Sequence, residues 1–336
     1  MSRFFDAVRR ADGCRLRPSD LLRRRSAEEA ERERRGFRVI SVVSNKGGVG
    51  KTTVATNLAV YLRAMREDLP ILVLGLDDQP AIDRMFAIGA AAEPPTVADA
   101  LRAGSLAPAI RLGQYGVHYV PTSARISELK REIADPGLLE SVLERTGWRG
   151  IVVVDTKSDL EILTQNALRA SDLALVLARD QLSLGEAGKV FELLGGWKRP
   201  RETARVLLSL VDLRVRYAEG GKRDVLSLLL SEIRSLGHPL FETFLSSSPK
   251  VESLQTNPAR AVKSILHGAP TSIVHRQMRL LAEEVLRSVA PAEVPTGEAR
   301  PAAGARVAPA RPEQPVARAP ERAGDAGVGS WLGRAL

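Results

Sequence analysis

The chain has 336 residues, of which 44% are hydrophobic and 26% are charged, and its formal net charge is +9. This composition is that of a folded chain with room for one large α/β domain and extensions. No apolar run approaches the ~20 residues of a membrane-spanning helix, and the N-terminus lacks a signal-peptide core. Cys14 is the only cysteine, which excludes an intrachain disulfide and a metal site built from cysteines. We therefore expect a cytoplasmic protein.

The positive charge is spread along the chain. Residues 1–36 hold eleven Arg against seven acidic residues, residues 290–336 hold six Arg against five, and the remaining excess lies on residues 37–289. A mild basic excess is typical of proteins that contact DNA phosphates or an anionic membrane without sequence preference. A solvated surface in an arginine-rich proteome explains it equally well.

Residues 1–36 form a basic, arginine-rich N-terminal extension. Phe4, Phe5 and Val8 lie beside arginines and make a short amphipathic patch. Such a patch could touch a membrane or a partner, but it is more often a chain end that packs on its own domain.

A strand pattern and a helix pattern then flank a glycine-rich stretch. Residues 39–43 are apolar, residues 44–53 read SNKGGVGKTT, and residues 54–62 carry an apolar helical pattern. A helix N-terminus presents unpaired N–H groups, and glycines let the backbone curl around phosphate oxygens. The pattern predicts a phosphate-binding loop in which Lys51 reaches the β- and γ-phosphates and the Thr52 hydroxyl holds Mg²⁺.

This loop departs from the general pattern G-x-x-x-x-G-K-[ST], because Asn45 stands at the first glycine position and Lys46 follows it. The K-G-G-V-G-K-T-T form resembles the deviant Walker A motif of the ParA/MinD family of ATPases. The resemblance implies ATP and Mg²⁺ as cofactors. It also implies a catalytic role for Lys46, because the early lysine of that family reaches across a nucleotide-sandwich dimer to the partner's phosphates.

The next apolar run, residues 71–76, ends at the acidic sequence DDQP of residues 77–80. An acidic residue at the end of a strand beside a phosphate loop can orient water and reach the Mg²⁺ shell. In the ParA family this place commonly reads D-x-D-P-Q. Here Gly75 replaces the first Asp and Asp78 replaces Pro, so Asp77 takes the place of the catalytic carboxylate; as an alternative, the two aspartates only cap the next helix.

Residues 151–154 are apolar and end at Asp155, which is typical of a Walker B strand whose carboxylate holds Mg²⁺ through a water. An ordinary strand-end Asp would look the same. The family usually continues D-T-P-P, with a loop that senses the γ-phosphate, but Lys157 and Ser158 replace both prolines. Lys157 could contact phosphate, form a partner-facing salt bridge or loosen this loop.

Further apolar runs of strand length lie at residues 117–120, 173–177, 206–211 and 239–244, with helical patterns between most of them. Continuous apolar strands predict a parallel sheet that is buried on both faces by helices. We therefore expect an α/β, doubly wound, mostly parallel sheet of the P-loop NTPase type over residues 37–289, with its ligand at the carboxyl ends of the strands.

Two features near the end of this domain are candidates for ligand contacts. Ser209 and Asp212 resemble the family's adenine-proximal positions. Arg276 and Arg279 lie one turn apart on a helix predicted over residues 273–289 and could neutralise DNA phosphates across a dimer. A solvated helix face is the slightly favoured explanation of these two arginines.

The predicted site residues fall into three groups. The catalytic residues are Lys46, Lys51 and Asp77. The nucleotide-binding residues are Asn45, Lys46, Gly47, Gly48, Val49, Gly50, Lys51, Thr52, Thr53, Ser209 and Asp212. The metal-binding residues are Thr52, Asp77 and Asp155, the last through water.

Residues 290–336 contain seven prolines and predict a disordered Pro/Ala/Arg-rich tail. Its end holds Trp331, Leu332 and Leu336, which could serve as a short docking motif. This ending is too short and too interrupted by glycine to resemble the C-terminal membrane helix of MinD-like proteins well, so the membrane is an unfavoured partner.

Two functions fit these motifs. The first is a ParA/MinD-like ATPase that forms an ATP-dependent homodimer, positions or segregates cargo, and hydrolyses ATP slowly until an activating protein stimulates it. The dimer would bind a broad surface, either nonspecific DNA of the nucleoid, which is favoured, or a membrane. The second is a nucleotide-binding regulatory switch or scaffold with little hydrolysis, which Gly75, Lys157 and Ser158 favour.

A metabolic ligase of the same superfamily is a further alternative. Nitrogenase-reductase-like proteins are excluded by the lack of paired cysteines, and tyrosine autokinases by the lack of tyrosine in residues 290–336.

Overall fold

The computed structural model describes Arg32 and residues 34–88, 95–214, 216–217, 223–256 and 262–289. The predictions on the N-terminal patch and on the tail lie outside these residues; they concern Phe4, Phe5, Val8, Trp331, Leu332 and Leu336. Every helix in the described part of the chain is too short or too polar to cross a membrane.

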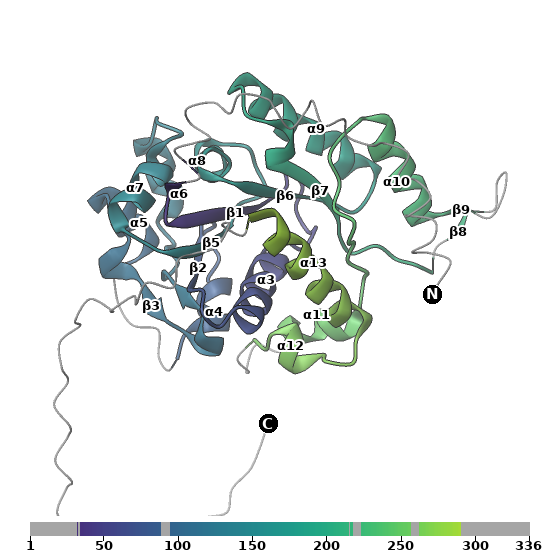
Figure 1. The fold of residues 1–336 in the computed structure, drawn as a ribbon, viewed down its shortest axis with the longest axis horizontal. Coiled ribbons are helices and arrows are strands. Elements are labelled where there is room, and N and C mark those ends of the chain that lie inside the picture. The colour runs from purple at the N-terminus through teal and green to yellow at the C-terminus, as the bar shows by residue number, and fades with distance from the viewer. Residues whose placement is uncertain are drawn as a thin grey trace, which may run out of the picture. The chain divides into compact units, whose positions relative to one another are not determined.

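A seven-stranded sheet forms the centre of the fold, in the order β3-β4-β2-β5-β1-β6-β7 (Figure 1). The strands are β1 (Phe37–Val43), β2 (Ile71–Gly75), β3 (Arg111–Leu112), β4 (His118–Tyr119), β5 (Gly150–Asp155), β6 (Leu173–Ala178) and β7 (Ala204–Leu208). Neighbouring strands are parallel except for β3, which is antiparallel to β4. The predicted mostly parallel sheet is confirmed, although the short strand β3 was not predicted.

Helices cover both faces of this sheet (Figure 1). The first face packs against α3 (Lys51–Met65), α4 (Ala81–Phe86), α11 (Pro249–Thr256), α12 (Ile265–Gly268) and α13 (Ile273–Val289). The second face packs against α5 (Val97–Ala103), α6 (Ile126–Glu132), α7 (Leu138–Thr146), α8 (Ile162–Ala170), α9 (Gln181–Gly196) and α10 (Val225–Ser235). Short 3-10 turns at η2 (Ala107–Ala109), η3 (Gln114–Gly116) and η4 (Arg201–Thr203) and a hairpin of β8 (Arg216–Tyr217) and β9 (Arg223–Asp224) complete the described elements.

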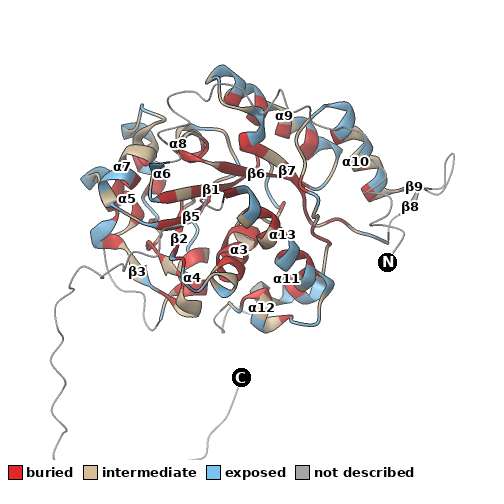
Figure 2. Cartoon of the chain, viewed as in Figure 1, coloured by how far each residue is buried: buried red, intermediate tan, exposed pale blue. Residues whose placement is uncertain are grey.

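Side chains of each central strand alternate between the two layers of helices. In β5, Ile151 and Val153 pack with the helices of the first face, whereas Val152 and Val154 pack with those of the second. All residues of β2, β5 and β6 are buried (Figure 2). Burial on both sides is the reason that these strands read as unbroken apolar runs.

The edge beyond β7 is less regular than the sequence predicted. The run predicted over residues 206–211 ends as a strand at Leu208, because Leu210 adopts a left-handed backbone conformation with φ of 53°. The prediction of a regular strand over residues 239–244 is wrong. That segment starts at a proline, which has no N–H to donate, and it pairs with β7 through single hydrogen bonds such as Phe241 N–H to the Val206 carbonyl, 3.0 Å.

Helix α13, predicted with the same bounds, holds this irregular segment in place. The buried Glu284 accepts the backbone N–H groups of Glu242 (2.8 Å) and Thr243 (3.1 Å). The buried Gln277 accepts the Ser246 N–H and donates to the Ser246 hydroxyl, both at 2.9 Å. Side chains of α13 therefore take over the pairing that a further strand would provide.

Candidate nucleotide site

The predicted phosphate loop lies between β1 and α3, at the carboxyl end of the sheet. Strand β1 has β5 and β6 as its neighbours, so the loop leaves the sheet where the strand order reverses, the usual ligand crevice of a doubly wound fold. Gly48 (φ 73°) and Gly50 (φ 89°) adopt left-handed conformations that strain any residue with a Cβ atom. This turn directs the free N–H groups of the first turn of α3 towards the loop.

Lys51, the first residue of α3, lies inside the site. Its side chain is buried, and its Nζ donates to the Ser158 hydroxyl at 2.5 Å. Burial lowers the pKa of Lys51, while the charges of Asp155 and Asp77 raise it. The ammonium group is thus surrounded by the two carboxylates predicted from the ends of β2 and β5.

Asp155, at the end of β5, is buried and only partly satisfied. Burial raises its pKa to about 7, against the opposing effects of a hydrogen bond with Thr52 and the charge of Lys51. Its Oδ1 has no hydrogen-bond partner in the structure. An unpaired buried carboxylate oxygen beside a threonine hydroxyl fits a divalent cation.

A magnesium ion at this place would receive few ligands from the protein itself. Within the described residues, no three His, Cys, Asp or Glu side chains form a ready-made metal cage. Mg²⁺ commonly keeps several waters and binds one or two protein groups plus phosphate oxygens. Thr52 and Asp155 match that requirement.

Asp77 follows β2 and is half-buried. Its Oδ1 accepts the backbone N–H of Asp78 at 2.7 Å. Burial and the neighbouring Asp78 raise the pKa of Asp77. Hydrogen bonds from Gln79 and Lys157 lower the pKa of Asp78 to about 2, so the aspartate pair has two different environments.

Lys46, the second lysine of the loop, lies at its rim. Its Nζ forms an ion pair with Asp180 Oδ2 at 2.7 Å, and its side chain is 32% exposed. Asp180 caps the N-terminus of α9 by accepting the Ser183 N–H at 2.8 Å. The neighbouring Asn45 amide donates to Glu186, which lies six residues after Asp180 in the same helix.

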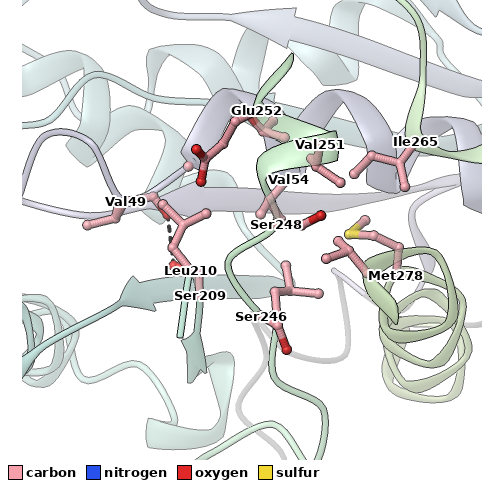
Figure 3. Close-up of a pocket in the computed structure, with 14 residues that line it drawn as sticks. Val49, Val54, Ser209, Leu210, Ser246, Ser248, Val251, Glu252, Ile265 and Met278 are labelled. Atoms are coloured by element: carbon pink, nitrogen blue, oxygen red, sulfur yellow. Dashed lines mark hydrogen bonds between the residues drawn. The ribbon is translucent and has the colours of Figure 1, made fainter. Parts of the chain in front are cut away.

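The two residues predicted near the adenine differ in their surroundings. The hydroxyl of the buried Ser209 donates to the Val49 carbonyl at 2.8 Å, which ties the end of β7 to the phosphate loop (Figure 3). Asp212 instead forms a two-point ion pair with Arg214, at 2.9 and 2.8 Å. The structure brings Ser209 to the loop and leaves Asp212 paired with an exposed arginine.

A mostly apolar pocket adjoins the phosphate loop between α3, α11 and α13 (Figure 3). Its lining includes Gly50 and Val54 from α3 and its N-cap, Leu210 after β7, Val251 from α11 and Met278 from α13. The left-handed conformation of Leu210 directs its side chain against Gly50. The pocket therefore places apolar surface beside the loop, next to Ser209.

Arg276 and Arg279 lie on the exposed face of α13. Arg279 Nε pairs with Glu283 Oε1 at 3.2 Å, across one helical turn. The structure does not bring these arginines to the phosphate loop.

Sequence reasoning missed Asp180 and Glu186, the partners of Lys46 and Asn45. One signal was available for Asp180. It follows the buried strand β6 and stands three residues before Ser183 at the start of an amphipathic run, which indicates a helix cap. Nothing in the sequence points to the contact with a loop more than 130 residues earlier.

The fold and the phosphate loop define a P-loop nucleotide-binding protein, and comparisons with known proteins agree. The family described as AAA domain matches residues 37–188. The chromosome-partitioning ATPase Soj of Thermus thermophilus is 30% identical over 255 residues, covering 75% of this chain and 96% of Soj. The chromosome partitioning protein ParA of Caulobacter vibrioides is 29% identical over 203 residues, covering 56% of this chain and 75% of ParA.

Among solved structures, the septum site-determining protein MinD of Pyrococcus horikoshii, in complex with Mg-ADP, has the same fold. It aligns with a TM-score of 0.57 and 23% identity, over 74% of this chain and 96% of MinD. The chain belongs to the ParA/MinD family of P-loop ATPases.

Proposed function

We propose that this chain is a partitioning ATPase that binds Mg·ATP at residues 44–53 and pairs with a second copy face to face to position cargo on DNA. One observation carries this proposal. The loop holds two lysines with different settings, since Lys51 is buried within the site and Lys46 is held at the rim by Asp180. We expect the outward lysine, once released from Asp180, to reach the phosphates bound by a second copy.

The residues of one subunit would divide the chemistry as follows. The N–H groups of α3 and the ammonium of Lys51 bind and orient the phosphates, and Asp77 orients the attacking water. Mg²⁺, held by Thr52 and through water by Asp155, supplies neutralisation of phosphate charge when bound. Lys46 of the second copy would supply the last positive charge.

The Lys46–Asp180 ion pair is consistent with slow turnover by a single copy. Lys46 is engaged with Asp180 of its own chain. Both side chains are about a third or more exposed, and such pairs contribute only about 0.2–1 kcal/mol. Contacts with a triphosphate and a second copy readily offset that amount, so dimerisation would release Lys46.

The surface on which the dimer acts is proposed to be nonspecific DNA. The chain carries a net charge of +9, and Arg276 and Arg279 are exposed on α13. Affinity that depends on phosphate contacts falls steeply as the salt concentration rises. A flat salt response would remove DNA from the proposal.

Sedimentation of the pure chain with ATP or ADP, with and without DNA, tests the proposal. ATP should produce a dimer that sediments with DNA, whereas ADP should leave the chain as a single copy. Lys46→Ala should abolish ATP-dependent pairing, while Lys198→Ala, an exposed lysine beyond the far end of α9, should leave it unchanged. Pairing that ignores both the nucleotide and Lys46→Ala would contradict the proposal.

A regulatory switch with little hydrolysis is the second candidate. It is favoured by the contact of Ser158 with Lys51, because this hydroxyl takes one of the three N–H donors of the ammonium group proposed to bind phosphate. Tight ATP binding with no phosphate release, even with DNA and a partner protein present, would select the switch.

A further inference from the structure

Two departures from the family's sequence pattern meet in space. Asp78 follows β2 and Lys157 follows β5, and these strands are parallel neighbours with Gly75 opposite Asp155. The two loops therefore leave the sheet at the same edge. Lys157 Nζ lies 3.2 Å from Asp78 Oδ2, and about a third of each side chain is exposed.

Asp78 connects this ion pair to the carboxylate that is proposed to orient water. Its backbone N–H donates to Asp77 Oδ1 at 2.7 Å. Its other carboxylate oxygen accepts the Gln79 amide at 3.0 Å. Lys157, together with a longer contact of 3.4 Å from the Ser127 hydroxyl, thus holds the Asp78 carboxylate, and the Asp78 N–H holds the Asp77 side chain.

Side chains also hold the rest of the loop after β5. Ser158 accepts from Lys51, and Asp159 pairs with Lys130 of α6 at 3.0 Å and accepts the Thr164 hydroxyl of α8 at 3.1 Å. Prolines would restrict the backbone of such a loop by fixing φ. Here contacts to other elements supply the restriction.

The end of β2 explains why a contact from outside is needed there. A Cβ atom on Gly75 would lie 2.7 Å from Ile82 Cδ1 and 3.1 Å from Thr122 Cγ2. The Ile82 side chain of α4 and the Thr122 methyl group thus fill the space beside Gly75, and glycine has no side chain with which to anchor the following turn. Lys157 supplies the ion-pair contact to this turn, beside the Ser127 hydroxyl.

We propose that Asp78 and Lys157 form a charged bridge that holds Asp77 in the position required for ATP hydrolysis, with Lys157 as a positioning residue that acts through Asp78. This inference rests on the proposed ATPase function. The bridge is too exposed to contribute much to folding, because ion pairs of this kind are worth little in water. Its effect should therefore appear in turnover and not in stability.

Steady-state phosphate release by Lys157→Ala, Asp78→Ala and the double variant tests the bridge. Each single variant should lose about tenfold in kcat, because small misplacements of a catalytic group are costly, while KM for ATP stays within about twofold. The double variant should be no slower than either single variant, since both remove the same contact. The charge-swapped variant Asp78→Lys/Lys157→Asp should recover most of the lost kcat.

Matched controls separate this effect from misfolding and from general charge loss. Arg66→Ala and Asp68→Ala break an exposed ion pair after α3, at 2.7 Å, and should leave kcat unchanged. Thermal unfolding of all variants should stay within about 2 °C of wild type. If Lys157→Ala is unfolded, Lys157→Met keeps the aliphatic stem and repeats the test.

Three results would overturn the bridge. Lys157→Ala could raise KM more than about tenfold at constant kcat, which identifies a phosphate ligand. The double variant could show the product of the single losses, or the single variants could match wild type. A wild-type chain that releases no more phosphate than Lys51→Ala contradicts the proposed function instead, and this inference with it.

Discussion

The phosphate loop and the loop after β5 face the same site but are held by different means. Residues 44–50 take their shape from backbone geometry, with glycines at φ 73° and 89°. Residues 156–159 are held by side chains, through contacts of Lys157, Ser158 and Asp159 with three other elements. A loop fixed by its backbone is insensitive to salt, whereas exposed ion pairs weaken as salt rises.

The largest effect should come from the cation within the backbone-held loop. Lys51→Ala removes the ammonium group proposed to bind the phosphates and should lower phosphate release by about 10³-fold, because its charge acts in a buried site. A malachite-green assay measures this loss, with Lys198→Ala as the control. Loss of less than about tenfold would show that the loop is not the site of turnover.

Asp155→Asn tests the buried carboxylate between the two loops. It should lower Mg-dependent hydrolysis by about 100-fold or more, because the negative charge of the unpaired carboxylate proposed to face the metal shell is lost. Titration of ATP hydrolysis with Mg²⁺ provides the measurement. Unchanged Mg²⁺ dependence would contradict the metal assignment.

The same variant should be more stable without nucleotide. Burial raises the pKa of Asp155 from 3.8 to about 7. At pH values between these two, Asp155 is protonated in the folded chain and ionised in the unfolded chain. The Asp155 contribution to stability therefore falls as pH rises through this window. Calorimetry at about pH 8 should show Asp155→Asn unfolding at least about 2 °C above wild type, and an equal or lower midpoint would contradict the cost of the buried charge.

Gly50→Ala measures how strongly the backbone of the phosphate loop resists change. A Cβ atom there would make only ordinary van der Waals contact, since its nearest neighbour is Leu210 Cδ1 at 3.7 Å. The cost is therefore that of φ 89°, about 1–2 kcal/mol. Gly185→Ala, within α9, is the matched control and should stabilise by about 0.5–1 kcal/mol. Urea unfolding of both variants checks the sign, and a stabilised Gly50→Ala would show that the turn does not require glycine.

The smallest effect should come from the ion pair at the rim. Asp180→Asn keeps the helix cap, because Asn and Asp cap equally well, but removes the charge that holds Lys46. ATP-dependent dimerisation should tighten by at most about fivefold, the limit set by an exposed pair. Sedimentation equilibrium with ATP measures it, and weaker dimerisation would mean that Asp180 serves the dimer itself.

The contrast between the two loops also explains what the sequence could predict. The phosphate loop, α3 and the carboxylates at the ends of β2 and β5 depend on local pattern, and the structure places these residues at the carboxyl end of the sheet. Their roles stay predictions. Ion pairs such as Lys46–Asp180 and Asp78–Lys157 join residues 134 and 79 positions apart. The sequence names such residues but not their partners, because the partners are decided by which strands become neighbours.

The irregular edge beyond β7 failed as a prediction for a related reason. Residues 239–244 carry a strand-like apolar run, yet their N–H groups bond to Glu284 as well as to β7. A buried carboxylate on a helix 40 residues later is invisible to a periodicity argument. The apolar run correctly predicted that residues 239–244 lie beside the sheet. The prediction that they form a regularly paired strand was wrong.

Helix α13 lies between the pocket beside the phosphate loop and the solvent, which are separated by one helix diameter, about 10 Å. Met278 lines the pocket beside the phosphate loop, and Gln277 accepts a hydrogen bond from the N–H of Ser246, another residue of that pocket. Arg276 and Arg279, on the same turns, face solvent. A polyanion bound to the outer side and a nucleotide base bound in the pocket would both contact α13. A shift of this helix on binding one of them would therefore change the contacts of the other.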